Sequence, residues 1–511
     1  MSLIQYLTRP YVQIPYYELN PYFWTINRML NKYLLSVCFL LLIMSACRKD
    51  ERILKGPGTM GFSTDTVYFD TVFTKLPGSP YPRSINKQFM VRNPYNETVK
   101  MNVRLGGGSN SVYRINVDGR SGTIIQDIEI LPKDSTWVFV EATLEANNAT
   151  NPILVRDSIE FETNGNLQYV QLAAYGWDAY YFKDTVFEVN TSWILNDKPY
   201  VIVNTSFIDV GVTLTIGPGI HVYSTTNSVL VDTNNVKYYY HALNVLGTLK
   251  VNGTQSNPVI FEGDRLDNSF ADKPGQWQGI GFYRTSVDNV IHHAIIKNAT
   301  YGVRVDSLSN NANPKLTITN SIIKNMSGLG IWGRTGSIFC QNTVVSNCAI
   351  ALFYAQLGGQ YEFYHCTMNN VSAGSKDPHF IISNQERNDN KVVVKTYPIG
   401  FTIVNNIING PNETEFFFDL HASQNLPNPS IIQKNLLRYK GKIGVSNYYI
   451  TNKTTGGGVN NDPKFEEPSK SLLKIKSDSP ARDSALLIGV TIDLEDKSRD
   501  SKPDLGAYEY Q

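Results

Sequence analysis

The chain of 511 residues has no excess of charge of either sign. Its 46 Lys and Arg residues are balanced by 45 Asp and Glu, which leaves a formal net charge of +1. Proteins that bind nucleic acid normally carry a basic excess, because the contacted phosphates must be neutralised. The charge balance therefore argues against a nucleic-acid partner.

Cysteine is also scarce, with 5 in the whole chain. Cys38 falls inside an apolar export segment and Cys47 ends it, so only Cys340, Cys348 and Cys366 remain for the folded part. Three cysteines cannot make a complete disulfide framework. We expect them to pack as small apolar side chains.

Clusters of acidic side chains are missing from the coils of residues 294–410. No stacked array of carboxylates is visible that could bind calcium or act as acid and base on a glycosidic bond. A Ser-His-Asp pattern and a phosphate-binding glycine loop are absent too, so no catalytic residue, metal or cofactor is predicted. The acidic residues of the repeat region are scattered at Asp306, Glu362, Asp377, Glu386 and Asp389. The other polar candidates are Asp264-Arg265, His292-His293, Glu362 with His365, and His421.

Only one long apolar run is present, at residues 34–46. It is too short for a confident membrane-spanning helix and is typical of the central region of a signal peptide. Arg28 and Lys32 supply the positive charge that precedes such a region, which favours Met29 as the start of translation. Residues 1–46 are therefore interpreted as an upstream extension followed by a signal peptide.

The run ends in Met44-Ser45-Ala46-Cys47, which resembles the lipobox of bacterial lipoproteins, with Met44 in place of the usual leucine. The resemblance implies cleavage before Cys47 and a diacylglycerol on its thiol, so that the chain is held to a membrane by lipid. We expect a lipidated tether over residues 47–61.

Charged residues follow the predicted lipidation site. Lys49, Asp50 and Glu51 are similar to the surface-export signal of Bacteroidota lipoproteins, and the alternative is an ordinary charged tether. The resemblance implies an outer-membrane protein that faces the cell exterior.

Residues 62–180 show short strands of period-2 alternation separated by turns. Gln88-Phe89-Met90-Val91 is one such strand, and Asn93-Pro94-Tyr95-Asn96 is one such turn. The order of strands and turns resembles immunoglobulin-like modules fused to surface proteins, which implies a β-sandwich that spaces or binds. Residues 181–198 are expected to form a connector.

Residues 199–511 contain a repeat of a few apolar residues closed by Asn or Gly. Successive closing residues are 27, 22, 23 and 40 positions apart, and the first three steps suit one coil of stacked strands. Asn at such turns tolerates left-handed geometry, and its amide can bond to the Asn of the next coil. The closing asparagines are Asn298, Asn325, Asn347 and Asn370. The expected inward ladder comprises Ile296, Ile323, Val345, Met368 and Ile408.

Several motifs in this region resemble right-handed parallel β-helix proteins. They include Val212–Gly219, Ala242–Leu249 and Gln276–Ile280, and the ending Asp504–Glu509 resembles the last strand of Bacteroidota β-helix lipoproteins. The resemblance implies an all-β chain, with an immunoglobulin-like sandwich followed by a right-handed single-stranded parallel β-helix. It also implies that the last strand caps the final coil, since an open solenoid end invites aggregation.

The function favoured by the sequence is a non-catalytic surface lipoprotein. Its β-helix would act as a binding or scaffold subunit for outer-membrane proteins, including as part of a complex, or for surface glycans. One alternative is a carbohydrate-active enzyme, a polysaccharide lyase or glycoside hydrolase, which rests on fold analogy. It requires a β-helix face with two convergent carboxylates or a carboxylate–Arg/Lys set. The other alternative is an adhesive or purely structural surface protein.

Overall fold

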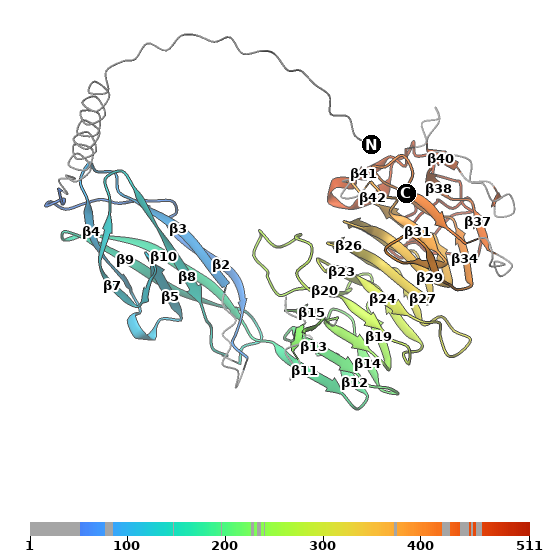
Figure 1. Cartoon of the computed structure of the whole chain (residues 1–511), viewed down its shortest axis with the longest axis horizontal. Coiled ribbons are helices and arrows are strands. Elements are labelled where there is room, and N and C mark those ends of the chain that lie inside the picture. Colours follow the sequence, from blue (N-terminus) through green and yellow to red (C-terminus); the bar gives the residue numbers. More distant parts are fainter. Residues whose placement is uncertain are drawn as a thin grey trace, which may run out of the picture.

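The computed structural model of the chain is all-β, with an N-terminal pair of sheets joined to a long coil of parallel strands (Figure 1). Within the described residues no helix is long and apolar enough to cross a membrane. Cys47, Lys49, Asp50 and Glu51 lie outside the described part of the chain. The structure describes residues 52–76, 85–146, 148–195, 197–225, 229–231, 237–239, 241–371, 376–421, 430–439, 449–450, 453–455 and 462–511.

The N-terminal unit contains two five-stranded sheets. Alternate residues of both sheets point into one shared apolar core, as the period-2 pattern predicted. The first sheet has the order β1 (Gly61–Phe62), β3 (Ile85–Arg92), β8 (Ser135–Ala142), β5 (Tyr113–Val117) and β6 (Arg120–Gly122). The second has the order β2 (Thr66–Phe73), β10 (Asn166–Trp177), β9 (Ile153–Thr163), β4 (Val99–Leu105) and β7 (Ile124–Ile130). A short 3-10 helix, η1 (Gly108–Asn110), follows β4.

The segment before β1 is docked on this unit rather than free. The Thr98 amide donates to the Arg52 carbonyl at 2.8 Å. The Asn164 side chain donates to the carbonyls of Leu54 and Gly56, each at 2.8 Å. Residues from Arg52 onward are therefore bonded to this unit, so the predicted tether over residues 47–61 is too long at its C-terminal end.

The second unit is one sheet of 26 strands that runs from β11 (Tyr180–Phe187) to β40 (Lys453–Thr455). Its strand pairings are parallel, which is consistent with a parallel β-helix. The prediction of an all-β chain with a long parallel sheet is confirmed. The sheet already includes β11 and β12 (Thr191–Trp193), so residues 181–198 belong to the first coil and are not a connector.

Successive strands fall into three stacks, because each strand pairs with its equivalent one coil later. The first stack contains the first half of β13 (Tyr200–Ile208), β15 (His221–Ser224), β20 (Val259–Gly263), β23 (Ala294–Lys297), β26 (Ile322–Met326), β28 (Val344–Cys348), β30 (Thr367–Asn369), β35 (Ile407–Asn409), β38 (Leu436–Arg438) and β40. The second contains the rest of β13, β18 (Leu243–Val245), β21 (Ile280–Phe282), β24 (Val303–Asp306), the first halves of β27 (Leu329–Gln341) and β29 (Ala351–Tyr364), β31 (Phe380–Ser383) and β36 (Phe416–Asp419). The third contains β12, β14 (Thr213–Ile216), β19 (Thr248–Asn252), β22 (Asn289–His292), β25 (Leu316–Thr319), the second halves of β27 and β29, β34 (Ile399–Val404), β37 (Ile431–Gln433) and β39 (Tyr449–Ile450).

The inward ladder of the first stack is confirmed. Ile296 pairs with Ile323, and the register continues through Val345 and Met368 to Ile408, all of them buried. A slip of one residue would bring Lys297 and Lys324 into the core, which disfavours any other register. The three described cysteines are free and buried, as expected.

The N-terminal unit and the coil pack directly against each other. Phe73, Val201 and Tyr223 form a small buried core between them, and the rings of Phe73 and Tyr223 lie 4.9 Å apart. Lys87 and Asp267 add an ion pair at 3.7 Å across the same junction. These contacts hold the two units together beyond the peptide link.

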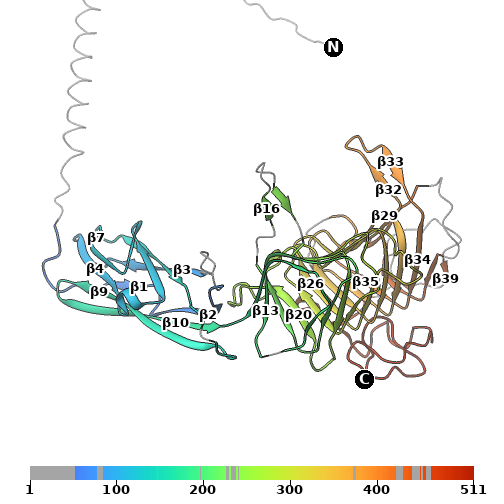
Figure 2. The same cartoon turned by 90° about the horizontal axis from the view of Figure 1, so that it is seen from below.

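The C-terminal segment, residues 462–511, lies along the outer side of the first stack (Figure 2). Its Ala507 amide donates to Thr367 Oγ1 at 2.9 Å, and Asn320 Nδ2 donates to the Asp493 carbonyl at 3.0 Å. The segment thus spans several coils, whereas the sequence predicted a cap on the last one. The reason is that the first stack has apolar side chains on its outer side as well, which must be covered. These outward residues are Ile322, Val344, Ile407 and Leu436. The segment itself contains β41 (Phe465–Glu467), η2 (Pro468–Lys470) and β42 (Leu472–Ile475).

A buried cluster of charged side chains holds this segment against the first stack. The Arg499 side chain, 1% exposed, contacts Glu509 Oε2 at 2.9 Å and donates to Asn342 Oδ1 at 3.1 Å. Asp493 and Asp504 are buried in the same segment, so carboxylates outnumber the guanidinium. Burial raises the pKa of Asp504 to about 6, and the nearby Glu509 and Asp483 add to the shift.

We predict that docking of residues 462–511 strengthens as pH falls. The docked state binds the Asp504 proton more tightly than the released segment, so its contribution is complete below the ordinary pKa of 3.8 and is lost as pH rises through about 6. Amide exchange of the segment, corrected for intrinsic rates, should be slower at about pH 5 than at about pH 7.5. Asp504→Asn should flatten this dependence, and stronger protection at the higher pH would contradict it.

Candidate functional site

The outward side chains of the second stack form a continuous line. Arg304 lies beside Trp332 in register, and the register continues from Trp332 to Tyr354. Two residues further along each strand, Asp306 lies beside Arg334. Because side chains alternate across a strand, these positions face away from the core. We call this surface the arginine–aromatic strip: Arg304, Asp306, Trp332, Arg334, Tyr354, Gln356, Ile381, Phe417 and Asp419.

Direct contacts fix the centre of the strip. The Arg304 guanidinium lies 4.4 Å from the centre of the Trp332 ring, and its Nε donates to Asp306 Oδ1 at 2.9 Å. Trp332 Nε1 donates to Gln356 Oε1 at 3.1 Å. The Tyr301 ring lies 5.3 Å from that of Trp332. These contacts set the rings and polar groups before any ligand arrives, which reduces the entropy cost of binding.

A hairpin of β32 (Gln385–Arg387) and β33 (Val393–Thr396) borders the strip and projects from the coil (Figure 2). It brings Glu386 Oε1 to 3.5 Å from Arg334 Nη2, and Arg387 Nη2 to 3.0 Å from Asp419 Oδ1. The Arg334 and Glu386 side chains remain 41% and 33% exposed, so their polar atoms are accessible to a ligand.

The charges of the strip balance locally. Each of the carboxylates Asp306, Glu386 and Asp419 lies within ion-pair distance of an arginine. Burial raises the pKa of Tyr354, and the nearby Asp419 and Glu386 raise it further, so its hydroxyl stays protonated at neutral pH.

A histidine closes the N-terminal end of this line. Burial lowers the pKa of His241 to about 4, so its ring is uncharged at neutral pH. The ring occupies the space above Gly281, where an added Cβ would come within 2.2 Å of it. Gly281 therefore accommodates the histidine ring at a position where the next coil carries Arg304.

The asparagines predicted at the turns lie on the first stack. Asn298, Asn325 and Asn347 have left-handed φ values of 65°, 60° and 54°. Their amides are joined in sequence, with Asn325 to Asn298 and Asn347 to Asn325 both at 3.4 Å. Asn370 differs, because its side chain bonds to the backbone N–H and carbonyl of Cys348 at 2.9 and 2.8 Å. These asparagine side chains therefore make the hydrogen bonds that stabilise the turns.

The other polar candidates are engaged separately. His292 contacts Thr319 Oγ1 at 2.7 Å, and His293 contacts Asp496 Oδ1 at 3.2 Å. Glu362 accepts a hydrogen bond from the Tyr364 hydroxyl at 3.1 Å. Among the described residues no group of three or more His, Cys, Asp or Glu is arranged to hold a metal ion. The remaining candidates bond elsewhere: His365 to Asn405, Arg265 to Asp267, and the His421 amide to Asn384.

The sequence pattern does not predict the strip. It gives Asp306 and Glu386 only as scattered acidic residues and does not distinguish Asp419. The available signal was the alignment of Val303–Asp306 with Ile331–Arg334, which places charged and aromatic residues at the same outward positions. The hairpin that returns Glu386 to this face falls within the 40-residue step of the repeat, and the length of that step does not predict where the inserted residues fold.

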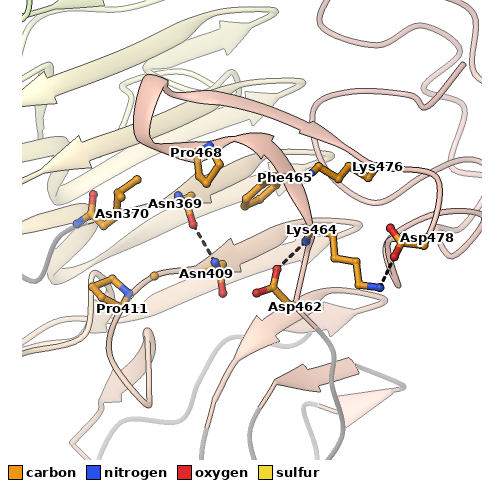
Figure 3. Close-up of a pocket in the computed structure, with 12 residues that line it drawn as sticks. Asn369, Asn370, Asn409, Pro411, Asp462, Lys464, Phe465, Pro468, Lys476 and Asp478 are labelled. Carbon is orange, nitrogen blue, oxygen red and sulfur yellow. Dashed lines mark hydrogen bonds and ion pairs between the residues drawn. The ribbon is translucent and has the colours of Figure 1, made fainter.

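A separate cleft of about 580 Å³ lies between the first stack and the C-terminal segment (Figure 3). Its polar groups bond largely to one another. Asn409 Nδ2 donates to Asn369 Oδ1 at 2.9 Å, and Lys464 Nζ lies 2.5 Å from Asp478 Oδ2. The strip offers more aromatic side chains than this cleft, which has Phe465 alone among its lining residues, so we take the strip as the candidate site.

No protein-family model matches the chain. No curated protein matches it. Solved structures with weak similarity include a PapD-like domain of human CEP192, with a TM-score of 0.16, 9% identity, and coverage of 24% of this chain and 88% of that one. The N-terminal domain of PorA has a TM-score of 0.17 at 9% identity and covers 23% of this chain and 97% of its own. A family 123 glycoside hydrolase from Clostridium perfringens has a TM-score of 0.18 at 8% identity and covers 25% and 30%. Scores this low carry no functional argument.

Proposed function

We propose that the chain is a non-catalytic binding lipoprotein of the outer membrane. A lipid on Cys47 anchors it, and it faces the cell exterior. Its N-terminal unit serves as an immunoglobulin-like support, and its coil is a right-handed β-helix that binds surface glycans along the arginine–aromatic strip.

The observation that carries this proposal is the composition of the strip. Trp332 and Tyr354 are partly exposed aromatic side chains with a polar atom each, and the Arg304 guanidinium lies over the Trp332 ring; amphipathic rings of this kind suit contact with sugars. Arg334 and Gln356 place donors and acceptors beside these rings, and they are held by neighbours rather than left to rotate. Because the charges pair off within the strip, a neutral or weakly charged glycan matches it better than a polyanion.

The first alternative is a carbohydrate-active enzyme, and one observation favours it. The strip and the hairpin that borders it contain a carboxylate–arginine set, with Asp306 and Asp419 on the strip and Glu386 on the hairpin. A catalytic carboxyl must reach the glycosidic bond, whereas each of these three carboxylates is held in an ion pair with an arginine. This pairing supports binding over hydrolysis. The second alternative, an adhesive or structural role, predicts that the strip binds no glycan.

We predict that Trp332→Ala and Arg334→Ala each weaken glycan binding by at least about tenfold, because aromatic and arginine side chains dominate the binding energy of well-packed contacts. The measurement is a glycan array probed with the full chain, followed by titration with the glycan it selects. Arg156→Ala, on an exposed position of β9, is the matched control and should bind as the wild type does.

The same titrations distinguish the alternatives. Release of shortened or unsaturated glycan products would establish that the protein is a carbohydrate-active enzyme. Absence of binding to any glycan, or equal affinity of all variants, would overturn the proposed role of the strip.

A further inference from the structure

Exposed apolar and basic side chains gather at the end of the N-terminal unit where the described chain begins. Ile53 and Leu131 are 42% and 38% exposed. Asn93 joins the Leu131 loop to the loop that precedes Thr98, the bridge partner of Ile53, because its amide donates to the carbonyls of Glu97 and Leu131 at 2.8 and 3.0 Å. Figure 1 shows this end pointing away from the coil. We call it the sandwich tip: Arg52, Ile53, Leu131, Pro132 and Lys133.

Ile53 is fixed in place at this tip. It forms a β-bridge with Thr98, and the Leu54 amide donates to the Thr98 carbonyl at 2.9 Å. Further along, the Met60 amide donates to Gln168 Oε1 at 2.7 Å. The segment from Ile53 to Met60 therefore cannot act as an extended tether without breaking these bonds.

The distance from the tip to the anchor is consequently short. Five residue steps separate Cys47, the proposed lipidation site, from Arg52. A fully extended chain spans at most about 3.6 Å per residue, so the Cα atom of Arg52 lies within about 18 Å of the Cα atom of Cys47. The lipidated sulfur of Cys47 lies at the bilayer surface, which brings the tip to the headgroup region.

We propose that the sandwich tip rests on the lipid surface, with Ile53 and Leu131 entering the headgroup region and Arg52 and Lys133 facing lipid phosphates. This inference rests on the proposed lipidation of Cys47. Asp134 is exposed in the same loop, so the apolar pair and the short leash carry the contact more than charge does. The membrane contact then orients the N-terminal unit and, through it, the coil.

The experiment uses the full lipidated chain in vesicles of phosphatidylcholine and phosphatidylglycerol that carry a quencher near the headgroups. A fluorophore is attached at Pro132→Cys in the tip or at Asn110→Cys in η1, at the opposite end of β4. The described native cysteines are buried and should not react. We expect strong quenching at position 132 and little at position 110.

Paired variants test the residues that make the contact. Ile53→Asp with Leu131→Asp should reduce quenching at position 132 by more than half, while Ile124→Asp, at a site 63% exposed, should leave it unchanged. Vesicles of phosphatidylcholine alone should retain most of the quenching, because the apolar pair carries the contact.

Mass spectrometry and vesicle flotation separate the two proposals. A chain without lipid on Cys47 that fails to float overturns the anchor, and the membrane contact with it. A lipidated chain that floats but is quenched equally at positions 132 and 110, or not at all, overturns the contact alone and leaves the anchor standing.

Discussion

Replacing Arg499 by methionine is expected to release residues 462–511 from the first stack while the coil stays folded. Arg499 is nearly inaccessible and lies within ion-pair distance of Glu509, and it donates to the Gly506 carbonyl at 2.9 Å. Without it, buried carboxylates lose their only arginine in this cluster, and breaking a buried pair in this way costs about 3–5 kcal/mol. Hydrogen exchange at the amides of Leu505 and Ala507 should rise accordingly.

The matched control for this substitution is Arg482→Met in the same segment. The Arg482 side chain is 42% exposed and lies 3.7 Å from Asp483. An exposed pair of this kind contributes about 0–1 kcal/mol, so exchange should stay near the wild-type rate. If both variants showed the same amide exchange rates, Arg499 would not be the residue that holds the segment on the first stack.

A second large loss of stability is expected for Glu415→Ala. Glu415 and His379 are both fully buried on successive coils, with His379 Nδ1 2.6 Å from Glu415 Oε2. Glu415 also accepts the amide N–H of His379 at 3.1 Å and that of Asn412 at 2.7 Å. Truncation removes the carboxylate that accepts from these donors, which costs about 3–5 kcal/mol.

Urea denaturation followed by circular dichroism measures this loss as a lower midpoint. Glu415→Gln keeps one acceptor oxygen and should lose less than the alanine variant. Glu466→Ala, at an exposed position of β41, serves as the surface control. A wild-type midpoint for Glu415→Ala would show that the His379 contact contributes little to the fold.

The sequence was sufficient for features that repeat within a coil. Ile296, Ile323 and Val345 recur with their neighbours in the same order, so the inward ladder and its register follow from the apolar pattern. The two-sheet unit was predictable for the same reason, because buried and exposed residues alternate along β4 and β8.

Features that join distant segments could not be predicted in this way. The position of residues 462–511 depends on the outward face of the first stack, where Val344 and Ile407 require cover. The strip depends on the register between coils and on the return of Glu386 through a hairpin. Neither the position of this segment nor the strip can be predicted from the local sequence pattern, because each depends on residues tens to hundreds of positions apart.

The most direct test of the proposed binding role is hydroxyl-radical footprinting of the full chain with and without the glycan selected on the array. Oxidation of Trp332 and Tyr354 should fall when the glycan is bound. Trp137, which is 46% exposed on β8, should be oxidised equally in both samples. Unchanged oxidation of the strip, or protection that appears instead around Phe465 in the cleft, would contradict the claim that this protein works through the outer face of its second stack.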